Sequence, residues 1–245
     1  MADSRAAIKK TKKLYDEVLE LLLERDRMTY FDSKALQLRY NEATEGLSLK
    51  LQRLQIDMIK LQYVLAAVQE GTDRGEAERR ADEELLQDEL FYEMQRQLKN
   101  PRDLLSEDEC EELDEIYSEL LTILNPDLNP CQTLDTASLF ISASSAYEYC
   151  RKDDLRAILD EARKFKTPDY EAMSDSEHAQ RQKDLKTARG QIRTMIEEIE
   201  DEFPFDKEEI LDDEDELAAE KERLLKSVET VGDMIETCRR MLEEA

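Results

Sequence analysis

Apolar residues recur at intervals of three and four along nearly the whole chain, which is the spacing of one face of an α-helix. A first stripe covers residues 14–28 and a second covers residues 36–68, and residues 30–33 interrupt the two. A linker this short makes consecutive helices antiparallel. The pattern therefore predicts a helical hairpin over residues 4–70.

Shorter helices fill the middle of the chain. Four are predicted, over residues 76–99, 107–124, 134–150 and 154–165. Ser106 and Glu109 have the spacing of a capping box at the start of the second of these helices. Pro126 and Pro130 end that helix, because proline fixes φ and pushes the residue before it out of the helical region. The stretch 124–130 is therefore predicted to be a rigid, exposed loop.

The C-terminal part repeats the long-helix pattern. A helix is predicted over about residues 176–202 and a last one over about residues 213–244, with seams that again step by three and four. The fold class is therefore all-α and elongated, with long antiparallel helical hairpins or coiled coils flanking a small helical domain. We expect an N-terminal hairpin (1–75), a helical middle domain (76–167), a C-terminal hairpin (168–245) and essentially no β-sheet.

Composition supports this fold and narrows the partners. Of 245 residues 39% are charged, the formal net charge is −26, and there are only five glycines and five prolines. The acidic balance repels phosphate backbones and anionic membrane surfaces, so we expect neither nucleic acid nor membrane as a partner. No apolar run approaches the roughly 20 residues of a membrane span, and the first 13 residues lack an apolar signal core. A cytoplasmic location is expected.

Residues with the chemistry of catalysis are sparse. The cysteines are scattered without a Cys-x-x-Cys pair, so reduced thiols are expected; they are Cys110, Cys131, Cys150 and Cys238. With the single His178 they do not make a convincing zinc site. No glycine-rich phosphate loop and no Ser/His/Asp arrangement is present. We therefore predict no enzyme, no catalytic residue, no metal site and no cofactor.

A series of motifs runs through the middle region. A helix with Tyr117-Ser118-Glu119-Leu120 leads into Asn125-Pro126-Asp127-Leu128-Asn129-Pro130, and the next helix carries Phe140 and Ala146-Tyr147-Glu148 before Asp153-Asp154-Leu155. Over about residues 80–165 this series resembles a J-domain, the module of DnaJ-type co-chaperones. Most of the chain resembles a bacterial branch in which a degenerate J-like domain is embedded between acidic coiled-coil segments. Tyr117, Phe140 and Tyr147 are predicted to be core residues.

Two departures from the family pattern shape the expected function. The family's His-Pro-Asp loop engages a DnaK-type chaperone and triggers ATP hydrolysis, but here Asn125 replaces the histidine while Pro126 and Asp127 are kept. Asparagine carries no positive charge. The helix before the loop is basic in J-domains, whereas here no Lys or Arg lies between Arg102 and Arg151. Like charges across that interface slow association.

The sequence thus predicts a non-enzymatic protein–protein interaction protein, a J-like adaptor or scaffold without ordinary stimulation of a DnaK-type chaperone. Asn125, Pro126 and Asp127 are the candidate partner-binding residues. The alternatives are an atypical active co-chaperone that uses this loop and a purely structural coiled-coil protein. The loop also has a structural alternative, a turn in which Asn or Asp satisfies backbone donors. The expected partners are proteins, with a DnaK-type chaperone and a second copy bound through the seams as candidates.

Overall fold

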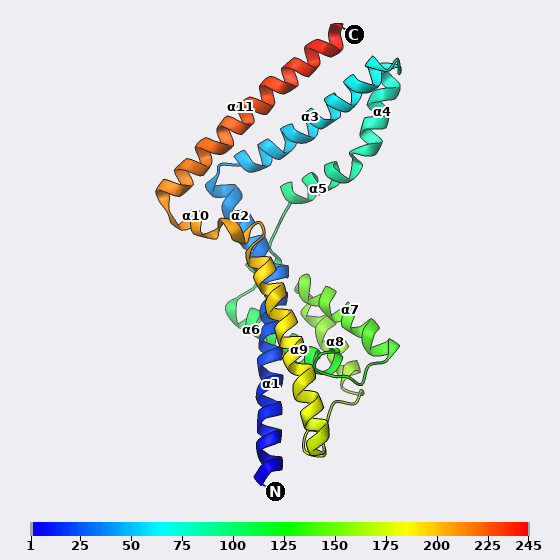
Figure 1. Cartoon of the computed structure of the whole chain (residues 1–245), viewed down its shortest axis with the longest axis vertical. Helices are drawn as coiled ribbons and strands as arrows, with labels where there is room; N and C mark the ends of the chain where they lie inside the picture. The colour runs from blue at the N-terminus through cyan, green and yellow to red at the C-terminus, as the bar shows by residue number, and fades with distance from the viewer. Residues whose placement is uncertain (1, 245) are drawn as a thin grey trace. The chain divides into compact units, whose positions relative to one another are not determined.

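The computed structural model describes residues 2–244, and every regular element in that range is helical (Figure 1). The predicted all-α fold class is confirmed. In chain order the elements are α1 (Ala2–Arg27), η1 (Met28–Asp32), α2 (Ser33–Ala43), α3 (Leu47–Gln69), α4 (Arg74–Glu84), α5 (Leu86–Arg96), η2 (Pro101–Leu104), α6 (Glu107–Leu124), α7 (Leu134–Glu148), α8 (Lys152–Ala162), α9 (Asp175–Glu200), η3 (Phe205–Lys207), α10 (Glu208–Asp212) and α11 (Glu214–Glu244).

The chain folds into two compact units, each assembled from segments that are distant in sequence. The first unit contains the chain up to Ser33 together with Asn100–Phe205. The second unit contains Lys34–Lys99 together with the chain from Asp206 onward. This division differs from the three consecutive domains predicted from sequence.

The long helices pair differently from the prediction. In the first unit α1 packs along α9, and in the second unit α3 packs along α11 (Figure 1). The predicted break at residues 30–33 is a π-helical turn that α2 follows directly, with no hairpin loop. The predicted hairpins of residues 4–70 and 176–244 are therefore not the pairs that form. Apolar residues spaced by three and four predict that one face of a helix is buried against another helix. They do not show whether that other helix is the neighbour in sequence or a distant one.

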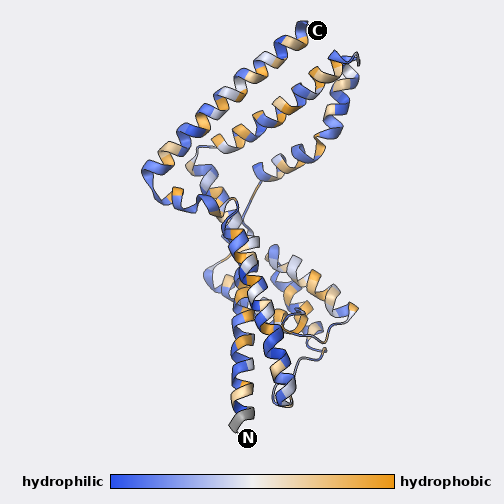
Figure 2. Ribbon diagram, viewed as in Figure 1, coloured by the Kyte–Doolittle hydropathy of each residue, from blue (hydrophilic) through white to orange (hydrophobic). Residues whose placement is uncertain are grey.

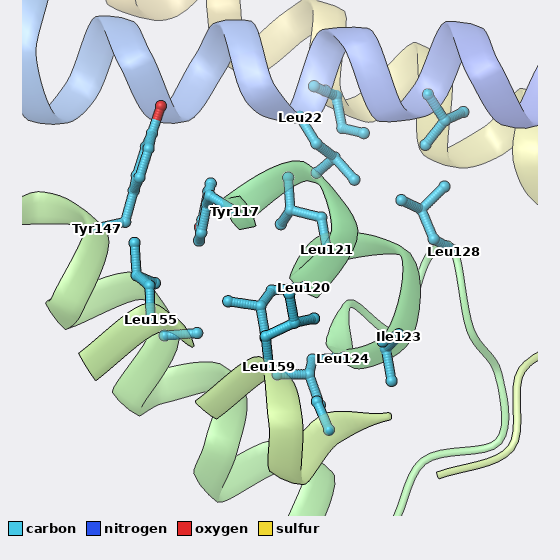
Figure 3. Close-up of a cluster of buried hydrophobic side chains, with 14 of the residues drawn as sticks. Leu22, Tyr117, Leu120, Leu121, Ile123, Leu124, Leu128, Tyr147, Leu155 and Leu159 are labelled. Atoms are coloured by element: carbon cyan, nitrogen blue, oxygen red, sulfur yellow. The ribbon is translucent and has the colours of Figure 1, made fainter. Parts of the chain in front are cut away.

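The core of the first unit lies where α6, α7 and α8 meet α1 and α9 (Figure 3). The apolar residues at helical spacing in α6 are buried except for Ile116, which is half-buried against the same core; the buried ones are Leu113, Tyr117, Leu120, Leu121 and Leu124. Tyr117 and Tyr147 are fully buried, as predicted, and Phe140 packs at the edge. The predicted capping box at the start of α6 is also present, with Ser106 and Glu109 each bonded to the other's backbone N–H.

The second unit has a smaller core. α3 packs against α4, α5 and α11, and the buried cluster consists of Val64, Leu65, Ala77, Ala81 and Leu242. Gly71 follows α3 with a φ of 93°, a left-handed conformation that glycine adopts without steric cost. Asp73 then caps α4 by accepting hydrogen bonds from the N–H groups of Gly75 and Glu76. Hydrophobic and hydrophilic residues are interspersed along these helices (Figure 2).

A buried carboxylate joins α2 to α11 inside this unit. Glu220 is 7% exposed, and its Oε1 accepts a 2.6 Å hydrogen bond from the Tyr40 hydroxyl. Arg223 donates to both of its carboxylate oxygens, at 2.6 and 2.7 Å. The Arg223 hydrogen bonds, with a smaller contribution from Tyr40 and against the effect of burial, lower the pKa of Glu220 to about 2.

Replacing Glu220 by glutamine should lower the free energy of unfolding at pH 7 by about 2 kcal/mol. The folded-state pKa lies below the ordinary value of 4.5, so the stabilisation is complete above pH 4.5 and is lost as pH falls through about 2. Thermal unfolding of wild type and variant from pH 7 to pH 2 should therefore show a gap that closes below pH 4.5. Glu222→Gln, at an exposed position two residues after Glu220 on α11, is the control and should change the curve little. A gap of constant size across this range would contradict the assignment.

Candidate functional site

The Asn-Pro-Asp turn lies between α6 and α7. Asn125 is the C-cap of α6 and is buried, and its side-chain Oδ1 accepts a 2.9 Å hydrogen bond from the Asp127 N–H. Its carbonyl accepts from the N–H groups of Leu128 at 3.2 Å and Asn129 at 2.8 Å. Pro126 is exposed and Asp127 is half-buried. The Asn125 side chain thus closes the turn on itself, as in an Asx-turn, and does not point to solvent.

Asn129 fastens the far end of the turn. Its side chain is fully buried, and Nδ2 donates to the carbonyls of Ile123 at 2.7 Å and Lys166 at 2.9 Å. Its Oδ1 accepts from the Cys131 N–H at 3.0 Å. One amide thereby ties the end of α6, the approach to α7 and the segment after α8 to each other.

Arg181 holds the middle of the turn from α9. It is buried, and its Nη2 donates to the carbonyls of Asp127 and Leu128, each at 2.7 Å. The Leu128 side chain is fully buried in the core beside α6 (Figure 3). The turn is thus fixed by its own Asn125, by Asn129 and by Arg181, which leaves Pro126 as its exposed residue and Asp127 as its partly exposed one.

Part of the acidic surface of α6 is paired with α8. Glu112 binds Lys152 at 2.9 Å and also Arg156, and these hydrogen bonds hold the pKa of Glu112 below its usual value. One heptad further on, Glu119 accepts from Arg163 Nε and Nη2 at 2.9 and 3.1 Å. The seven-residue spacing of the acids matches that of Arg156 and Arg163. The basic residues closest to α6 are therefore engaged with its own carboxylates.

Another part of the α6 surface carries exposed acidic residues. Glu107, Asp108 and Glu111 are exposed, and so is Glu115 one turn further on. Acids in the first turn favour the positive end of the helix dipole. This surface of α6 is accordingly negatively charged.

A pair of stacked tyrosines lies in the core between α6 and α7. The rings of Tyr117 and Tyr147 are 3.9 Å apart at 7°, and both side chains are fully buried. The Tyr117 hydroxyl donates to Asp26 Oδ2 at 2.8 Å and the Tyr147 hydroxyl donates to Asp114 Oδ1 at 2.6 Å. Burial, reinforced by these carboxylates, raises the pKa of both tyrosines well above the ordinary value. They are structural hydroxyl donors, not titrating groups.

Arg102 completes this polar cluster from η2. Its guanidinium lies 4.2 Å from the centre of the Phe31 ring, its Nη2 is 3.1 Å from the Tyr147 hydroxyl, and it pairs with Asp114. The sequence singled out the tyrosines but not Arg102, Asp26 or Asp114. In a chain that is 39% charged, no local pattern marks which charged residues are buried.

The cysteines and the histidine fall into separate surroundings. Cys131 is exposed and the other three cysteines are half-buried. His178 is buried in the α1–α9 seam, where its Nδ1 lies 2.9 Å from the Thr11 Oγ1. Within residues 2–244, no group of three or more His, Cys, Asp or Glu side chains is placed to hold a metal ion. None of the helices described for these residues is long and apolar enough to cross a membrane.

No protein-family model matches this chain, and neither does any curated protein or any solved structure. The resemblance to J-domains therefore rests on the residues of this chain alone.

Proposed function

We propose that this chain is a non-enzymatic interaction protein, a J-like adaptor or scaffold that does not stimulate a DnaK-type chaperone in the ordinary way. The observation that carries the proposal is the environment of Asn125. Its side chain is 3% exposed and its Oδ1 accepts a hydrogen bond from the Asp127 N–H, so this oxygen is engaged inside the turn. The family's loop histidine has no counterpart at the surface of this turn.

The charge of α6 supports the same proposal. Glu111 and Glu115 are exposed, while Glu112 pairs with Lys152 and Arg156 of α8, and Glu119 pairs with Arg163 at the C-cap of α8. A partner that recognises J-domains through an acidic face would meet like charge here, which lowers the association rate. The surface formed by α6, the turn, α7 and α8 would therefore suit partners that lack such an acidic face.

The surroundings of His178 support a non-enzymatic role. Thr11 and His178 have the hydroxyl–imidazole contact of a nucleophile and its base. Both side chains are buried between α1 and α9, however, and the Thr11 hydroxyl donates to the Ala7 carbonyl at 3.0 Å. A substrate has no access to this hydroxyl, so the pair is a seam contact.

The test is single-turnover ATP hydrolysis by a purified DnaK-type chaperone, with and without the full chain. We expect no increase with wild type. A variant combining Asn125→His with Glu111→Lys and Glu115→Lys should raise the rate several-fold, because it restores the loop histidine and positive charge on α6.

The matched control carries the same three changes plus Asp127→Ala and should lose the increase. Circular dichroism checks that all variants keep their helical content. Stimulation by wild type that Asp127→Ala abolishes would establish the atypical co-chaperone instead. A triple variant that folds but remains inactive would count against a J-like origin of this surface.

A further inference from the structure

α5 presents its apolar side to solvent. Its large apolar residues Leu86, Leu90, Phe91 and Met94 are 50–57% exposed, and no residue of this helix is buried. Positions i, i+4, i+5 and i+8 lie on one helical face, so these four side chains form one contiguous stripe. We call them the α5 stripe.

The polar side of α5 is the side that contacts the rest of the second unit. Arg53 of α3 lies over the Tyr92 ring, with the guanidinium carbon 5.6 Å from its centre, and pairs with Glu89. Gln95 is hydrogen-bonded to Gln37 of α2. An ordinary surface helix buries its apolar face and exposes its polar one. α5 does the reverse.

This inversion distinguishes the stripe from incidental surface residues. Single exposed apolar side chains are common on folded proteins, whereas contiguous exposed patches mark interaction sites. α5 holds four large apolar residues together on one face in a chain that is 39% charged. Since polar contacts already fix the opposite face, the stripe is free to take a partner without rearranging the unit.

Charge indicates what kind of partner fits. Glu84 is the last residue of α4 and Asp88 lies in the first turn of α5; both are exposed, and neither has an ion-pair partner among the described residues. The neighbouring Glu83 and Glu89 are already paired with Arg79 and Arg53. A second copy of a chain with net charge −26 would bring further like charge to this face. A positively charged partner would instead be attracted to these carboxylates.

We propose that α5 docks a basic amphipathic helix of a partner protein. The apolar anchors of that helix, spaced by three and four residues, would cover the α5 stripe, and its Lys or Arg residues would pair with Glu84 and Asp88. This docking surface lies in the second unit and does not depend on the J-like function proposed for the first.

The test is a titration of the full chain with two labelled 18-residue probe peptides, followed by fluorescence anisotropy. Both probes carry leucines on the same helical face. Their charged positions are identical, but these positions hold lysine in one probe and glutamate in the other. The lysine probe should bind with a Kd on the order of 10 µM, more weakly as salt rises, and the glutamate probe should not bind.

The variants separate the two parts of the site. Leu90→Ser with Phe91→Ser should weaken binding of the lysine probe at least tenfold. Glu84→Gln with Asp88→Asn should weaken it several-fold and flatten the salt dependence. Ile141→Ser, at a position 72% exposed in the first unit, is the matched control and should leave binding unchanged. All of these positions are exposed, so the variants are expected to fold, which circular dichroism verifies.

Four results would overturn the proposal. They are failure of the lysine probe to bind, equal binding of both probes, binding unaffected by the Leu90/Phe91 change, and an equal loss in Ile141→Ser. Sedimentation of the chain without a probe peptide tests whether a second copy of the chain covers the α5 stripe. A dimer that the Leu90/Phe91 variant dissociates would assign the stripe to a second copy, and a monomer supports the basic partner.

Discussion

Tyr147→Ala is expected to lower the free energy of unfolding of the chain by about 3–5 kcal/mol. The ring is fully buried, stacks on Tyr117 at 3.9 Å and meets the edge of Phe31 at 5.1 Å. Truncation removes these contacts and leaves a cavity that the surrounding helices fill only in part. It also takes away the hydroxyl that donates to Asp114 at 2.6 Å.

Two companion variants divide this loss into its parts. Tyr147→Phe keeps the ring and removes only the hydroxyl, and since Asp114 retains Arg102 it should cost about 1–2 kcal/mol. Tyr149→Ala, two residues away and 60% exposed, should change stability by no more than about 0.5 kcal/mol. Urea unfolding followed by circular dichroism measures all three. Equal losses in the Tyr147 and Tyr149 alanine variants would contradict the packing described for the first unit.

Local chemistry explains which parts of the fold the sequence could predict. The Ser106–Glu109 box and the proline turn depend on residues within a few positions of each other, so their signals are complete in the sequence. The buried ring of Tyr117 follows from helical spacing. The predicted interruption near residues 30–33 is present as a π-helical turn, but this turn leads directly into α2, so the hairpin loop predicted from it does not form.

Pairings between distant helices could not be predicted in this way. Leu14 and Val18 of α1 are buried against α9, and Arg189 of α9 pairs with Glu17 at 2.5 Å, 172 residues away. The three–four period of α1 is the same whichever helix covers it. The hairpin prediction paired α1 with the next long helix in sequence, whereas α1 packs against α9, which begins at Asp175.

The candidate site shows the same division between local and distant signals. The turn-forming role of Asn125 was one of the two readings that its sequence context allowed, and the structure has this side chain inside the turn. The contribution of Arg181 had no sequence signal, because it reaches the turn from 54 residues away in a helix rich in charged residues. Tertiary contacts therefore determine how firmly the candidate loop is held.

Arg181→Met is expected to lower the free energy of unfolding by about 2–4 kcal/mol. Methionine has similar length and retains the packing of the aliphatic stem, but it cannot donate to the carbonyls of Asp127 and Leu128. Each carbonyl would lose a buried partner, and an unsatisfied buried acceptor costs about 1–3 kcal/mol. The loss should also appear locally, as faster amide hydrogen exchange in residues 125–131 than in the body of α6.

Lys183→Met is the matched control, since Lys183 lies two residues further along α9 and is exposed. It removes a positive charge from the same helix without touching the turn, so stability and exchange should stay close to wild type. If Arg181 acted only through its charge, both variants would give the same small change. An Arg181→Met protein whose turn exchanges as slowly as wild type would show that Asn125 and Asn129 hold the loop without it. If the turn instead exchanges faster while the chain stays folded, the Arg181→Met variant can be used in binding experiments. These would test whether a mobile Pro126–Asp127 segment binds partners that the fixed segment does not.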